Sequence, residues 1–126
     1  MPRYFIFLMM MLMTALALSA QKHMDKVVAE ITKSGNVTSI IYSEERGGAG
    51  NKLVESKRFI SFSDIDYNQK IYDAMTLDRP KSSSYKEVVG TGGSGVYTIE
   101  FHGSGKTVTT YTLLCPNSIS ITTVYK

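Results

Sequence analysis

The chain has 126 residues, with 43% hydrophobic and 20% charged side chains and a formal net charge of +3. This length suits a single domain. The 14 basic residues are scattered and form no block of the kind that nucleic-acid-binding proteins carry, so nucleic acid is not an expected partner even though the pI is about 9.0.

The first twenty residues, Met1 to Ala20, have the pattern of a secretory signal peptide. Arg3 supplies the positive charge, the run from Tyr4 to Leu18 is almost entirely apolar, and small residues precede a cleavage site before Gln21. The apolar run has about 15 residues, short of the roughly 20 that cross a bilayer, so we expect no membrane span after cleavage. Residues 21–126 are therefore expected to form one α+β domain in the periplasm or outside the cell.

Cys115 is the only cysteine of the chain. It lies far from the cleavage site, so a lipoprotein anchor is not expected, and no intramolecular disulfide is possible. Because Leu113 and Leu114 precede it, we interpret Cys115 as a small buried hydrophobic residue. A nucleophilic thiol and an intermolecular disulfide are the alternatives.

The first element expected after the leader is a helix from Lys22 to Ser34. Its apolar residues recur at the spacing i, i+3, i+4 and i+7, namely Met24, Val27, Val28 and Ile31. Gly35 and Asn36 end the helix as a left-handed cap would.

Two strands follow, from Val37 to Glu45 and from Leu53 to Phe62. The flexible loop Arg46 to Asn51 joins them into a long hairpin. Lys57 and Arg58 lie in the middle of the second strand, which indicates an edge strand or a solvated face.

A second helix is expected from Asp64 to about Leu77. Ser63 stands where an N-cap is needed, and the acidic residues that follow it favour a helix N-terminus. The helix ends at Asp78-Arg79-Pro80, because the residue before a proline avoids the helical conformation. Its apolar stripe is Tyr67, Ile71, Ala74 and Met75.

The rest of the chain predicts four more strands. A strand from Tyr85 to Val89 and a glycine-rich loop lead into a hairpin from Val96 to Leu114, and the last strand runs from Ile119 to Tyr125. In the hairpin, alternation places Tyr97, Ile99 and Phe101 on one face and Thr98, Glu100 and His102 on the other. The order α-β-β-α-β-β-β-β predicts an α+β fold, with an antiparallel sheet of about five or six strands and two helices packed on one face.

Two glycine-rich motifs resemble nucleotide-binding loops but lack the required context. Gly90, Gly92 and Gly95 match G-x-G-x-x-G, yet strand residues follow where a helix must begin. Residues 103–107 resemble the end of a P-loop, but Glu100 occupies the position of its first glycine, and a strand follows again. We therefore expect no nucleotide and no other cofactor.

No group of residues has the spacing of a metal site or a catalytic triad. Neither His23 nor His102 has a Cys, His or Asp at metal-ligand spacing, and no serine lies in a nucleophile-elbow context. His102 and Glu100 share one strand face and support one alternative, a small hydrolase-type enzyme. We expect instead a protein with no catalytic and no metal-binding residues.

Three segments carry a resemblance to a family of proteins. They are Met24-Asp25-Lys26-Val27-Val28, the strand Val37-Thr38-Ser39-Ile40-Ile41, and Ala74-Met75 with Asp78-Arg79 before the strand at Tyr85. These segments resemble short exported bacterial proteins of unknown function, which look like a leader followed by one small α+β domain. Pro80 and the run from Lys81 to Ser84 depart from that pattern. The resemblance implies export and the fold class, and it implies no catalytic residues.

The sequence thus favours an exported, non-catalytic binding protein with an unknown protein or glycan as its partner. Its oligomeric state is left open. The expected contact residues are Arg46, Gly47, Gly48 and Asn51 in the first loop and Gly90, Thr91, Gly92, Gly93, Ser94 and Gly95 in the second, with Tyr42 and Tyr111 as interface aromatics. The alternative is an inhibitor of a secreted hydrolase that presents the loop Gly90 to Gly95 to a cleft.

Overall fold

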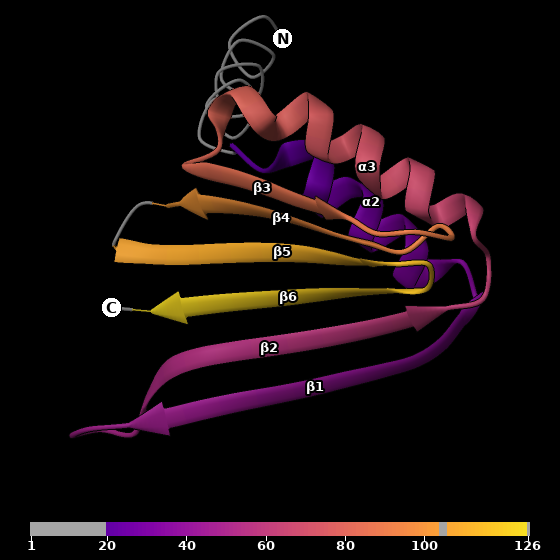
Figure 1. The fold of residues 1–126 in the computed structure, drawn as a ribbon. Coiled ribbons are helices and arrows are strands. Elements are labelled where there is room, and N and C mark those ends of the chain that lie inside the picture. The colour runs from indigo at the N-terminus through magenta and orange to yellow at the C-terminus, as the bar shows by residue number, and fades with distance from the viewer. Residues whose placement is uncertain (1–19, 104–105, 126) are drawn as a thin grey trace, which may run out of the picture.

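The computed structural model describes residues 20–103 and 106–125 (Figure 1). Residues 1–19 of the predicted leader, and Ser104 and Gly105 of the P-loop-like turn, lie outside the described residues. The described elements follow the chain as α2 (Lys22–Lys33), β1 (Val37–Gly47), β2 (Lys52–Phe62), α3 (Asp66–Asp78), the short 3₁₀ helix η1 (Arg79–Lys81), β3 (Ser84–Val89), β4 (Gly95–His102), β5 (Thr107–Cys115) and β6 (Ser118–Tyr125).

The strands form one antiparallel sheet in the order β1-β2-β6-β5-β4-β3. This confirms the predicted α+β class with an antiparallel sheet of six strands and two helices. In Figure 1 the helices lie beside the strands at the top of the view, and the hairpin β1–β2 lies at the bottom. The part of the chain that the structure describes contains no helix that is long and apolar enough to cross a membrane.

The core is one cluster of buried residues from both helices and from β2, β4, β5 and β6. Ile99 and Phe101 are buried, and Glu100 between them is not, as the alternation in the sequence predicts. The other buried hydrophobic residues of the strands are Ile60, Phe62, Tyr111, Leu113, Ile119 and Ile121. The helices contribute Met24, Val27, Val28 and Ile31 from α2 and Tyr67, Ile71, Ala74 and Met75 from α3. These helix residues are the stripes that the 3.6-residue period predicts.

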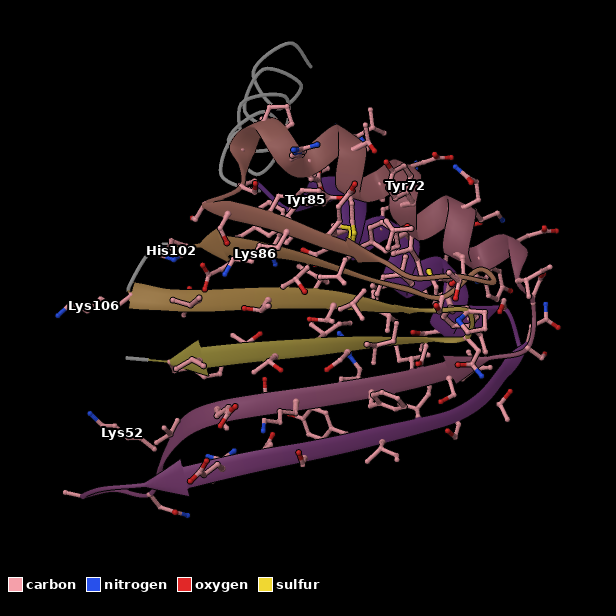
Figure 2. All side chains as sticks on the ribbon, in the orientation of Figure 1. Lys52, Tyr72, Tyr85, Lys86, His102 and Lys106 are labelled. Atoms are coloured by element: carbon pink, nitrogen blue, oxygen red, sulfur yellow. The ribbon has the colours of Figure 1, made fainter. Side chains whose placement is uncertain are left out.

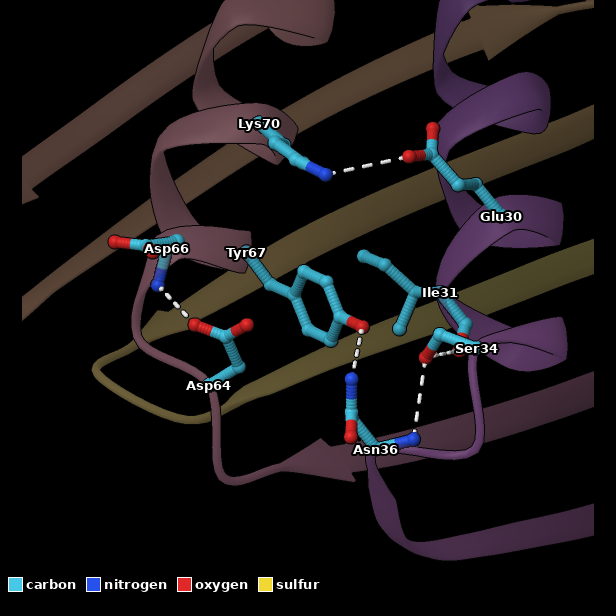
Figure 3. Close-up of polar contacts among 8 residues, drawn as sticks. All are labelled: Glu30, Ile31, Ser34, Asn36, Asp64, Asp66, Tyr67 and Lys70. Carbon is cyan, nitrogen blue, oxygen red and sulfur yellow. Dashed lines mark hydrogen bonds and ion pairs between the residues drawn. The ribbon is translucent and has the colours of Figure 1, made fainter.

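Polar contacts join the two helices at their outer surface (Figure 3). Lys70 on α3 reaches Glu30 on α2 at 3.3 Å. Nearer the sheet, the side-chain amide of Asn36 donates a hydrogen bond to the Tyr67 hydroxyl at 3.2 Å, and Tyr67 packs edge-on against Phe62. These contacts fix how the chain leaves α2 and enters β1.

The N-terminus of α3 differs from the prediction. The helix begins at Asp66, and its N-cap is Ile65, which makes no side-chain capping bond. Asp64, not Ser63, satisfies a free backbone donor, because its carboxylate accepts a hydrogen bond from the N–H of Asp66 at 3.0 Å. The prediction of Ser63 as N-cap is therefore wrong, because a turn at residues 64–65 intervenes before the helix begins.

The charges in Leu53 to Phe62 indicated an edge strand or a solvated face, and the structure excludes the edge. β2 lies between β1 and β6. Its charged residues instead mark solvent access on both faces of the hairpin, since Lys57 is exposed and Arg58 is only half-buried.

Candidate interaction surface

β1 is an edge strand with an exposed apolar centre. It has eleven residues and pairs with β2 alone among the described strands. The side chains of Ile40, Ile41 and Tyr42 are 46%, 61% and 59% exposed. No charged residue occurs between Val37 and Ser43. A long edge strand with an exposed apolar centre is a template for pairing with another strand.

The opposite edge of the sheet is of a different kind. β3 has six residues, and Lys86 and Glu87 lie in its middle (Figure 2). Short edge strands that carry charges are a common protection against pairing. Val88 and Val89 are exposed, but they stand at the end of this strand. Of the two edges, only β1 therefore combines length, exposure and an uncharged centre.

The helices leave β1 open on both faces. All residues of β1 except the two terminal ones are exposed. The ring contacts of α3 reach Phe62 and Tyr97, and α2 contacts the sheet at Tyr111, all of them on strands other than β1. An added strand beside β1 would consequently meet no obstacle from the helix layer.

A hydrogen-bonded group lies at the outer end of β1. The Tyr42 hydroxyl donates to the Glu44 carboxylate at 2.5 Å, and Arg46 Nη2 lies 2.9 Å from the same carboxylate. The hydrogen bond to Glu44 raises the pKa of Tyr42, and the hydrogen bond from Tyr42 holds the pKa of Glu44 below its usual value. The Glu44 carboxylate therefore already has a hydrogen-bond donor in Tyr42 and a cationic partner in Arg46.

Glu45, on the other face, has no such partner. It stands directly opposite Glu55 in the register of β1 and β2. Lys57 lies 3.6 Å from Glu55, and the side chain of Glu45 forms no ion pair or hydrogen bond with any described residue. Together with Ser43 and Glu44 these residues line a hollow of about 110 Å³.

The structure does not bring the two predicted contact loops together. Gly47 and Arg46 belong to β1, so the first loop shrinks to residues 48–51, with Gly48 and Asn51 at positive φ. The second loop, residues 90–94, follows β3 at the other edge and the other end of the sheet.

The second loop is a compact turn. The N–H of Gly90 donates to the carbonyl of Ser94 at 3.0 Å, and the Ser94 hydroxyl donates to the carbonyl of Thr91 at 2.8 Å. Gly92 and Gly93 have φ of +68° and +83°, which favours glycine. The inhibitor function assigned to this loop stays a prediction.

The prediction of Tyr111 as an interface aromatic is wrong. Tyr111 is 2% exposed, and its hydroxyl donates a hydrogen bond to Asp25 at the start of α2. Burial raises the pKa of Tyr111. The signal was present in the sequence, because Tyr111 shares its strand face with Leu113. Tyr42, the other predicted aromatic, is on the exposed edge.

Two histidine–carboxylate contacts occur in the described chain. His102 Nε2 lies 3.6 Å from Glu100 on the open face, where the His102 side chain is 59% exposed. This pair is solvated, so the geometry adds nothing to the hydrolase alternative. The second contact joins His23 Nδ1 to Asp78 at 2.7 Å.

Asp78 is a buried polar residue that the sequence reasoning missed. Besides His23, it accepts a hydrogen bond from the N–H of Met24 at 2.7 Å. That N–H belongs to the first turn of α2, where helices have no partners of their own. Asp78 at the end of α3 therefore caps α2, and this role explains its burial.

Cys115 is half-buried and packs against the core near Leu113 and Tyr97. Burial raises the pKa of the Cys115 thiol. Since the thiolate is the nucleophilic form, this environment disfavours the alternative of a reactive thiol.

Comparison of the chain with protein-family models, with curated proteins and with solved structures finds no match.

Proposed function

We propose that this protein is an exported, non-catalytic binding protein of the bacterial envelope or the extracellular space, and that it binds an extended segment of another polypeptide as an added strand beside β1. The observation that carries the proposal is the exposed, uncharged centre of this long edge strand. The leader pattern in residues 1–20 supports export.

Strand addition fits both the backbone and the side chains of β1. An edge strand presents a row of unpaired N–H and C=O groups, and a second extended chain satisfies them. Ile40 and Tyr42 lie on the face that carries the helices, since Ile40 pairs with the buried Ile60, and Ile41 lies on the open face. A bound strand would therefore gain apolar contacts on both of its faces.

Pairs of matched variants test this proposal. Ile41→Lys places a charge in the centre of β1, and Val88→Lys places the same charge on β3, at a site of similar exposure (61% and 68%). The probes are short peptides selected from a random library against the unmodified protein. We expect Ile41→Lys to weaken their binding about tenfold or more, because an isoleucine buried on binding contributes about 1.5–3 kcal/mol. Val88→Lys should leave their affinity unchanged.

Amide hydrogen exchange identifies the surface that the peptides cover. We expect bound peptide to slow exchange in β1 (Val37–Gly47) and to leave β3 (Ser84–Val89) unaffected. Protection outside β1, equal losses of affinity in the two variants, or a selection that returns no peptide protecting β1 would each contradict the proposal.

A further inference from the structure

We infer that the segment that pairs with β1 carries a lysine or an arginine at one defined position, opposite Glu45, and three apolar residues opposite Tyr42, Ile41 and Ile40. This inference rests on the proposed strand addition at β1. It deepens that proposal, because it states the chemistry and the spacing of the partner segment.

Glu45, at the outer end of the hairpin, has no cationic partner among the described residues. Like charges directly opposite each other on neighbouring strands destabilise a sheet. Glu45 and Glu55 are directly opposite each other on β1 and β2. Lys57 forms an ion pair with Glu55 at 3.6 Å and none with Glu45. Lys52, at the hairpin tip in Figure 2, makes no ion pair with Glu45. A basic side chain on an added strand would supply the counter-charge from the free side of β1.

An added strand is expected to pair with β1 in the antiparallel direction, and this direction sets the order of its residues. All five pairings of the sheet are antiparallel, and antiparallel pairs are slightly more stable than parallel ones. In an antiparallel partner the residue opposite Glu45 comes first, and the residues opposite Tyr42, Ile41 and Ile40 follow as the third, fourth and fifth after it. The partner segment therefore reads basic, two unrestricted residues, then three apolar residues.

Two copies of β1 do not satisfy Glu45 when they pair in a register that aligns their apolar centres. Antiparallel pairing of two β1 strands centred on Ile41 would place Val37 opposite Glu45. Parallel pairing in register would place Glu45 opposite Glu45. Neither arrangement supplies a cation where the structure needs one, whereas a different polypeptide with a basic residue does.

A set of synthetic peptides tests the inference on the whole protein. The first probe is a fluorescent peptide Thr-Lys-Thr-Ser-Val-Ile-Val-Thr, and two further probes carry Gln or Glu in place of the Lys. We expect the Lys peptide to bind about two- to fivefold more tightly than the Gln peptide, the range for an exposed ion pair, and the Glu peptide to bind most weakly. The preference should fall as salt is raised.

Charge-neutral variants assign that preference to Glu45. We expect Glu45→Gln to abolish the preference for the Lys peptide, while the matched variant Glu87→Gln on β3, another exposed edge-strand glutamate, retains it. Equal affinities of the three peptides, with β1 still protected from exchange, would overturn the basic-residue inference and leave strand addition intact. A peptide affinity that Ile41→Lys leaves unchanged would overturn the proposed function itself. A dimer in sedimentation that Ile41→Lys abolishes and Val88→Lys does not would identify a second copy as the occupant and overturn the inference.

Discussion

Asp78 connects the two helices, and removing its carboxylate should loosen the helix layer. The side chain of Asp78 is only 3% exposed, and its oxygens lie 2.7 Å from the N–H of Met24 and 2.7 Å from His23 Nδ1. A carboxylate at the end of α3 is unfavourable for the dipole of that helix, but it faces the N-terminus of α2, where negative charge is stabilising. Asp78 therefore contributes to stability through α2 and not through its own helix.

The size of the effect follows from these contacts. Asp78→Ala removes the capping carboxylate and leaves the buried N–H of Met24 without its partner, so we expect it to lower the free energy of unfolding by about 1–3 kcal/mol. Asp78→Asn keeps an oxygen for the N–H of Met24 and should cost about half as much. The matched control is Asp73→Ala on the exposed side of α3, which should change the free energy by less than about 0.5 kcal/mol.

Urea denaturation followed by far-UV circular dichroism measures these differences, and the chain contains no tryptophan that would offer a simpler probe. Hydrogen exchange in α2 gives a local readout, because its first turn should open more readily without the cap. If Asp78→Ala costs no more than Asp73→Ala, the capping role derived from the structure is refuted.

Three further outcomes are expected. Ile99→Ala should lower the free energy of unfolding by about 2–5 kcal/mol, because Ile99 is fully buried, whereas Val89→Ala at an exposed site should have little effect; urea unfolding compares the two. Tyr111→Phe should cost about 1.5–3 kcal/mol, because it removes a hydrogen bond to the Asp25 carboxylate, and a loss below about 0.5 kcal/mol in the same assay would contradict that contact. Burial raises the pKa of Tyr85 to about 12 in the folded protein, so its contribution to stability is fully present below the ordinary tyrosine pKa of about 10 and is lost as the pH rises through 12. Tyr85→Phe should flatten that part of the stability profile, and ultraviolet titration should show one late-ionising tyrosine fewer, since the pKa values of Tyr42 and Tyr111 are raised as well.

The elements of this fold could be predicted because they depend on local periodicity. The 3.6-residue spacing of Met24, Val27 and Ile31 and the alternation of Ile99 and Phe101 each require one buried side, whatever the neighbours are. The structure places all five residues in the core.

The order of the strands could not be predicted, because it depends on pairings between distant segments. The apolar run at Ile40 and Ile41 is also typical of a buried central strand, and the charges at Lys57 and Arg58 are compatible with either an edge strand or a solvated face. The exposed edge, and with it the candidate site, therefore emerges only from the sheet order.

Local sequence patterns also could not predict that Asp78 caps α2. Capping rules consider residues next to a helix end, and Asp78 reaches α2 from 54 positions along the chain. Tyr111 differs from this case, because its burial followed from the alternation with Leu113 and only its partner, Asp25, depends on the tertiary fold.

Site-specific photo-crosslinking in the native host tests strand addition at β1 most directly. A photoreactive amino acid at position 42, on β1, is compared with the same amino acid at position 72, an exposed tyrosine on α3 (Figure 2). We expect position 42 to crosslink to one discrete polypeptide segment, position 72 to give no such product, and Ile41→Lys to abolish the product from position 42. A product from position 72 alone, or a product from position 42 that persists in the Ile41→Lys background, would contradict binding at β1.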